Sequence, residues 1–162
     1  MNKTYNITLN SNYCTLESLP NQNTDKNYYI DWSAVLPDKN FKLTFTFISE
    51  TNTIQTMANI PIVTIDFLNI SYNYICQQSY QATSSNILGL IFPTNIDPNA
   101  HSAYLRSDKN FNNPIYISRP RQNNFNVQIV NNVNPPAVWS DDGAIPLSIS
   151  PYVLILSFEE CE

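Results

Sequence analysis

The run Pro151-Tyr152-Val153-Leu154-Ile155-Leu156-Ser157-Phe158-Glu159 constrains the fold more than any other stretch of the chain. β-branched, aromatic and aliphatic residues dominate it, a proline opens it and acidic residues close it. This is typical of a strand buried on most of both faces. Upstream, Phe125-Asn126-Val127-Gln128-Ile129-Val130 alternates apolar and polar residues, which predicts a strand with one buried face. Both strands need a second layer to cover them, so the sequence predicts packed sheets.

Other segments repeat the same period-two pattern. The clearest is 41–47, where Phe41, Leu43, Phe45 and Phe47 share a face opposite Lys42, Thr44 and Thr46. Further strands are predicted within 5–9, 28–32, 60–68, 70–74, 87–92 and 115–118, with a brief one near Tyr104. We expect loops over 12–27, 77–86 and most of 95–113, and a long end loop over 131–143 anchored by Trp139. No stretch has a sustained helical period with caps, so helix is expected to be minor.

Eight to ten short strands separated by Asn- and Pro-rich loops predict an all-β protein, an antiparallel two-sheet sandwich. Both immunoglobulin-like and jelly-roll connections fit this count. The length of 162 residues favours a single jelly roll, because immunoglobulin domains are shorter and have a characteristic Cys…Trp…Cys spacing that this chain lacks. We therefore expect residues 1–162 to form a single jelly-roll domain.

The charge of the chain disfavours one class of partner. The formal net charge is −5, so there is no basic footprint for nucleic acid. Charged residues make up only 13% of the chain while asparagine is abundant, so the surface is expected to be largely neutral and polar. Contact with other proteins would explain this, and so would a bias towards A/T-rich codons; both explanations stay open. With only two glycines, asparagine is expected to take the turn positions with positive φ.

Cysteine usage and hydropathy indicate the compartment. Cys14, Cys76 and Cys161 have spacings that match no zinc or redox motif, so free thiols are expected. The N-terminal residues lack the apolar core of a secretory signal, and the longest apolar stretch, 87–92, is far too short to span a bilayer. We expect a soluble chain made in a cytosol-like compartment, with no membrane partner.

No residue set indicates catalysis. His101 is the only histidine and lies in a polar segment, which excludes a histidine-rich metal site. Asp141 and Asp142 suit a turn better than a calcium site or a carboxylate pair. Arg119 and Arg121 flank Pro120 at a strand end, where a solvated loop is the default and an intersubunit ion pair is the alternative. We therefore expect no enzyme, and no catalytic, cofactor-binding or metal-binding residues.

The strand pattern carries a resemblance. The C-terminal segment from Arg119 to Glu160, with Arg119-Pro120, Phe125-Asn126-Val127-Gln128-Ile129, Trp139-Ser140-Asp141-Asp142-Gly143 and the closing strand, resembles the end of single jelly-roll capsid proteins of large double-stranded DNA viruses. The opening Tyr5-Asn6-Ile7-Thr8-Leu9 and the block from Tyr29 to Phe47 are similar to the N-terminal half of that group.

The resemblance implies a structural virion protein made in the host cytoplasm and located in the icosahedral capsid. Double jelly-roll major capsid proteins are more than twice as long, so the expected role is a penton at the fivefold vertex or a minor capsid protein. Expected partners are further copies of the chain, possibly in a pentamer that closes as a ring, the major capsid protein and other minor capsid proteins.

Two other functions remain open. A jelly-roll receptor- or glycan-binding module would need exposed aromatic and amide side chains, for which Trp139, Tyr104 and the Asn-rich loops are the candidates. A jelly-roll enzyme is disfavoured by the shortage of histidines.

Overall fold

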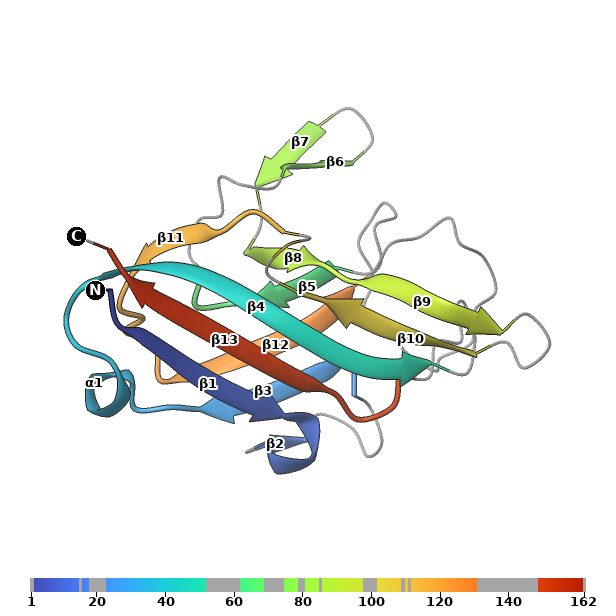
Figure 1. Ribbon diagram of the computed structural model, residues 1–162, viewed down its shortest axis with the longest axis horizontal. Coiled ribbons are helices and arrows are strands. Elements are labelled where there is room, and N and C mark those ends of the chain that lie inside the picture. Colours follow the sequence, from blue (N-terminus) through green and yellow to red (C-terminus); the bar gives the residue numbers. More distant parts are fainter. Residues whose placement is uncertain are drawn as a thin grey trace.

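The computed structural model describes residues 2–14, 16–17, 23–51, 62–68, 75–78, 81–84, 86–97, 102–108, 110, 112–130 and 149–161. Figure 1 shows two layers of strands stacked face to face, with both chain termini at the same end of the molecule.

The first sheet is antiparallel and has strand order β1-β13-β4-β10-β9, with β11 pairing to β4 beside this path. Its long central strand β4 pairs with β13 over eight residue positions. The bounds are β1 (Thr4–Asn10), β13 (Val153–Glu160), β4 (Asn40–Thr51), β10 (Ser102–Ser107), β9 (Phe92–Asp97) and β11 (Ile115–Ser118).

The second sheet is also antiparallel and has strand order β2-β3-β12-β5-β8. A separate hairpin of β6 and β7 projects from the body of the sandwich (Figure 1). The bounds are β2 (Leu16–Glu17), β3 (Asp25–Tyr29), β12 (Asn124–Val130), β5 (Ile62–Ile65), β8 (Ile87–Leu90), β6 (Ile75–Gln78) and β7 (Gln81–Ser84).

The connectivity is that of a jelly roll. The principal strands of the first sheet run β1-β13-β4-β10 and those of the second run β3-β12-β5-β8. In chain order these are the first, eighth, third and sixth strands facing the second, seventh, fourth and fifth. This alternation between two antiparallel sheets is the double Greek key of the jelly roll. The predicted all-β two-sheet sandwich is therefore confirmed.

The alternating segments build the core as predicted. Phe41, Leu43, Phe45 and Phe47 of β4 are all buried, and they face the buried Phe125, Val127 and Ile129 of β12 across the sandwich. The centre of the core is Trp32, which is only 1% exposed. Its ring lies 5.2 Å from Phe67, 5.5 Å from Phe125 and 5.7 Å from Phe158, which joins both sheets in one aromatic cluster.

The strand at the end of the chain differs from the prediction. Leu154, Leu156 and Phe158 are fully buried, but the alternate residues of β13 are only half-buried. The strand is therefore central in its sheet and covered on one face. Its apolar residues Val153 and Ile155 lie on the outer face of the sandwich.

Two other predictions were wrong. Residues 32–35 are not extended but form the short helix α1 (Trp32–Val35), because the Asp31 carboxylate accepts a 3.1 Å hydrogen bond from the Ser33 amide and caps its start. A helix of one turn is too short to give a 3.6-residue period in the sequence. A shorter 3-10 turn, η1 (Ser11–Tyr13), precedes β2.

The other error concerns polar strands. β7 lies inside the predicted loop 77–86, and β6 and β9 extend into predicted loops. Their polar side chains hide the period-two pattern. The brief strand predicted near Tyr104 is present as the six-residue β10. Among the described residues other than glycine, positive φ occurs at Asn95, with φ 50, in agreement with the expected role of asparagine.

Candidate functional site

The outer face of the first sheet carries a row of side chains that crosses four strands. The register pairs Val153 with Ile48, Ile48 with Arg106, and Arg106 with Phe92. Directly paired residues point to the same face of a sheet, so these side chains lie next to one another. We call Val153, Ile48, Arg106 and Phe92 the outer strip.

Apolar surface is exposed along the outer strip. The side chain of Ile48 is 48% exposed although it sits in the middle of a central strand. Thr46, Ile48, Phe92, Thr94 and Arg106 are among the residues that line an open groove of about 800 Å³ on this face. One exposed aliphatic residue would be ordinary, but a contiguous row of partly exposed apolar side chains beside a groove is a feature of interaction sites.

An aromatic residue and an arginine border the groove. The Arg106 guanidinium lies 4.8 Å from the centre of the Tyr104 ring, within range of a cation–π contact. Tyr104 is 37% exposed and pairs with Glu50 on β4 and Thr94 on β9. The border of the groove therefore contains both positive and negative charge next to apolar surface, which is the usual composition of a protein interface.

The outer face of the second sheet has a different chemistry. The Asn126 side-chain amide donates to Asp25 Oδ1 at 2.6 Å and to Asn27 Oδ1 at 3.1 Å, and Gln128 donates to Asp25 Oδ2 at 3.3 Å. The Asn126 backbone amide donates to Asp66 at 2.9 Å. These polar groups of β3, β12 and the turn after β5 bond to one another, so they satisfy much of one another's hydrogen-bonding capacity within this face.

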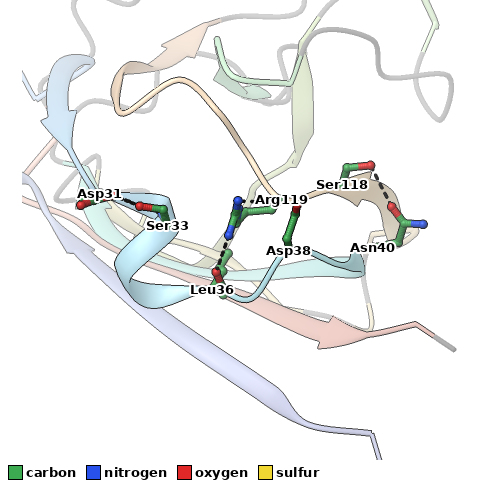
Figure 2. Close-up of polar contacts among 7 residues, drawn as sticks. All are labelled: Asp31, Ser33, Leu36, Asp38, Asn40, Ser118 and Arg119. Atoms are coloured by element: carbon green, nitrogen blue, oxygen red, sulfur yellow. Dashed lines mark hydrogen bonds and ion pairs between the residues drawn. The ribbon is translucent and has the colours of Figure 1, made fainter.

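Arg119 lies in the loop after β11, and Figure 2 shows it beside Leu36 and Asp38. Its guanidinium donates to the Leu36 carbonyl at 3.2 Å and lies 3.6 Å from the Asp38 carboxylate. Its backbone amide donates to the Lys39 carbonyl at 3.0 Å. Arg119 thus joins the segment just before β4 to the end of β11. The default prediction of a solvated loop is wrong for Arg119, whereas Arg121 is exposed.

Two tyrosines connect the sheets inside the sandwich. The hydroxyl of Tyr28 on β3 donates to the hydroxyl of Tyr152, just before β13, at 2.9 Å. Burial raises the pKa of Tyr28 to about 12 and also raises the pKa of Tyr152. Both phenols stay neutral over the physiological range, so this pair holds the layers together and supplies no acid–base chemistry at neutral pH.

Several candidates from the sequence lie outside the described residues: His101, Trp139, Asp141 and Asp142. Cys14 and Cys161 are free, half-buried thiols, as predicted. Cys76 lies in β6, and its side chain is outside the described part.

Two searches of the described residues gave no candidate. No group of three or more His, Cys, Asp or Glu side chains lies close enough there to hold a metal ion. No helix in that part is long and apolar enough to cross a bilayer.

No protein-family model, curated protein or solved structure matches this chain. The candidate site therefore rests on the geometry of the two sheets alone.

The outer strip was missed from the sequence, although a signal was present. On β4 the even-numbered positions 42, 44, 46 and 50 are charged or polar, and Ile48 breaks that series. An isolated apolar residue on the polar side of a strand is common. Only the register, which places Val153 beside it, shows that it belongs to a row.

Proposed function

We propose that this chain is a structural virion protein, a single jelly-roll capsid component. In this proposal it forms the penton at the fivefold vertex or acts as a minor capsid protein that contacts the major capsid capsomers. The observation that carries the proposal is the outer strip. A jelly roll alone supports many functions, but one with an exposed apolar row and a groove on a sheet face suits assembly.

The chemistry of the strip supports protein contact. Ile48 and Val153 offer apolar surface, and Tyr104 and Arg106 are residue types enriched in the energetic centres of interfaces. In a penton, the strip of each copy would contact a different surface of the next copy, so that the ring closes after five. In a minor capsid protein, it would contact the flank of a capsomer.

A glycan-binding module remains the alternative. Sugar rings stack on open aromatic faces, and of the two aromatic candidates from the sequence, Trp139 and Tyr104, the structure describes Tyr104. Its ring contacts the Arg106 guanidinium, which weakens this reading because a sugar would have to displace the arginine.

The test is the native mass of the purified protein, measured by light scattering over a range of concentration and salt. We expect an assembly, with a mass five times the 18.5 kDa chain for a penton. Ile48→Lys should dissociate it without unfolding the protein, because a buried unpaired charge is costly at an interface while the monomer keeps this side chain in solvent.

The matched control is Thr44→Lys, which adds the same charge to the same strand and the same outer face, outside the groove lining. It should leave the mass unchanged. A chain that stays monomeric throughout and binds a glycan array saturably, with binding lost in Tyr104→Ala, would replace assembly with the glycan-binding alternative.

A further inference from the structure

The first sheet ends at β1, whose outer edge has unused backbone groups. In the part of the chain that the structure describes, β1 pairs only with β13. The Ser11 amide donates to the Tyr152 carbonyl at 3.1 Å, and the Glu160 amide donates to the Lys3 carbonyl at 2.9 Å. Antiparallel pairs alternate, so odd-numbered residues of β1 bond to β13 and even-numbered residues point their N–H and C=O groups outward.

The sequence of β1 has no feature that would prevent another strand from pairing with this edge. Its seven residues, Thr-Tyr-Asn-Ile-Thr-Leu-Asn, include no charge and no proline. Natural edge strands avoid pairing through charged side chains, prolines, bulges or short length. A seven-residue uncharged strand with high β propensity is a template for another strand.

The opposite edge of the same sheet is protected. β9 contains Pro93 and Asp97, has Asn95 in the left-handed region and pairs with β10 through an irregular register. These are four of the devices that prevent strand addition.

The second sheet is protected as well. At β8, the Asn112 side chain accepts from the Leu90 amide at 2.8 Å and donates to the Leu90 carbonyl at 3.0 Å. Gly89 permits this approach, because a Cβ there would lie 2.6 Å from Asn112 Oδ1. At the other end of that sheet β2 has only two residues. Among the described edges, β1 is the one left long and uncapped.

The inner face of β1 also leaves apolar surface partly open. Tyr5 and Ile7 pack against the core but are only half-buried, whereas Leu9 is buried. The strand is nevertheless well fixed, since the Tyr5 hydroxyl donates to Glu160 at 3.0 Å and the Lys3 ammonium lies 5.0 Å from the Tyr5 ring. A strand added beside β1 would cover Tyr5 and Ile7. Because the β1 backbone is already ordered, β1 would lose little conformational entropy on binding.

We propose that β1 docks against β1 of a second copy of this chain, antiparallel and about a twofold axis at Ile7. This register pairs Thr4 with Asn10, Asn6 with Thr8 and Ile7 with Ile7. It uses all seven residues, and each outward-pointing even residue meets another even residue, as the hydrogen-bond pattern requires.

The self-pairing is favoured by the absence of repulsion. No charge within β1 opposes another, and Lys3 would face the polar Ser11 of the other copy. On the inner side Tyr5 would lie beside Leu9, an aromatic–aliphatic pair. The contact is small, so the dimer should form at moderate rather than very low concentration. It does not rest on the virion role, and a twofold contact does not itself close a ring of five.

The first test compares two substitutions at one position. Asn6→Pro removes an outward N–H at an edge, where proline is tolerated, and Asn6→Val keeps that N–H. Both lose the Ser157 hydroxyl bond to the Asn6 side chain, 2.7 Å in the native protein. By light scattering at rising concentration, the native chain and Asn6→Val should reach twice the mass of Asn6→Pro, whether the unit that pairs is a single 18.5 kDa chain or an assembly held by the outer strip.

Hydrogen exchange gives a second readout that folding alone does not change. On dimerisation the amides of Thr4, Asn6, Thr8 and Asn10 should gain protection, while those of Tyr5, Ile7 and Leu9 should be protected at every concentration. Uniform exchange behaviour along β1 would overturn the proposed register.

The outcomes separate this inference from the proposed function. A native chain without concentration-dependent mass, or an Asn6→Pro variant that associates like the native chain, overturns the β1 pairing. If Asn6→Pro has the same mass as the native chain at every concentration and only Ile48→Lys lowers the mass, the pairing is refuted while assembly through the outer strip stands.

Discussion

The outer face of the first sheet and the outer face of the second sheet are both exposed to solvent, but they differ in how their side chains are satisfied. On the second sheet Asn126, Gln128, Asp25 and Asp66 bond to one another or to the adjacent backbone. On the first sheet Ile48 exposes aliphatic surface beside a groove, and β1 exposes backbone donors at its edge.

The difference indicates which face serves contact. Covering the second sheet would remove polar groups from water, and groups that already bond to one another would gain little from a partner in return. Covering the first sheet would remove apolar surface from water, which is favourable in proportion to its area. The sheet with the satisfied polar network stabilises the monomer, and the sheet with the outer strip is suited to partners.

Both faces depend on one core, so disrupting that core has the largest expected effect on both. Trp32→Ala removes the indole that touches Phe67, Phe125 and Phe158, together with its 2.9 Å hydrogen bond to the Gln122 carbonyl. We expect the unfolding free energy to fall by about 3–5 kcal/mol in urea denaturation. Association should weaken in parallel, since both faces lose their support.

Trp32→Phe is the control for that experiment. It keeps a ring at the centre of the aromatic cluster and loses only part of the volume and the indole hydrogen bond, so the loss of stability should be clearly smaller. Equal stability of Trp32→Ala and the native chain would contradict the central place of this residue in the core.

The second prediction separates the two faces. Asn126→Ala removes the amide that bonds Asp25 and Asn27 on the second sheet. Partly buried carboxylate and amide oxygens then lose one of their donors, so the unfolding free energy should fall by about 1 kcal/mol. The native mass should not change, because this face is not the proposed contact.

The matched control is Asn124→Ala, an exposed asparagine on the same strand and the same face. It should change stability by no more than about 0.5 kcal/mol. A change of native mass in Asn126→Ala, at a concentration where the variant is folded, would reverse the assignment of the two faces.

Strands with one buried apolar face could be predicted from the sequence, and strands with mostly polar side chains could not. Strands β4 and β12 were recognised because their buried residues alternate strictly with polar ones. Strands β6, β7 and β9 were missed because their stability comes from pairing with a neighbour rather than from an apolar face. Tertiary context of that kind leaves no periodic signal in one sequence.

The candidate site was harder to predict than the fold. Ile48, Arg106 and Phe92 come from three distant parts of the chain, and only the register places them in one row. The described core is centred on Trp32, the first residue of a short helix that the sequence did not suggest. Trp139, the predicted anchor of the end loop, lies outside the described residues. For Arg119 the sequence favoured a solvated loop, with an intersubunit ion pair as the alternative, because its partners Leu36 and Asp38 lie about eighty positions away and leave no local signal.

The smallest expected effect concerns the end of the first sheet where β1 begins. The Lys39 ammonium and the Tyr5 hydroxyl both bond to the Glu160 carboxylate, and these contacts hold the pKa of Glu160 below its usual value of 4.5. A carboxylate whose pKa is lower in the folded state than in the unfolded state stabilises the folded state at pH values above the unfolded pKa. This contribution is lost as the pH falls through the folded pKa. Stability should therefore decline slightly as the pH drops below about 4.5. The loss should be small because the pair is exposed to solvent.

Glu160→Gln should remove that part of the acid dependence, as measured by urea denaturation between neutral pH and mildly acidic pH. Glu159→Gln leaves the contacts among Lys39, Glu160 and Tyr5 in place and should keep it. Protonation also frees the Tyr5 hydroxyl that anchors the start of β1, so acid should weaken pairing at the β1 edge more than association through Ile48. An acid effect that is the same in Glu160→Gln and in the native chain would mean that this end of β1 is held by packing on Phe41, whose ring lies 6.2 Å from that of Tyr5, and not by the carboxylate.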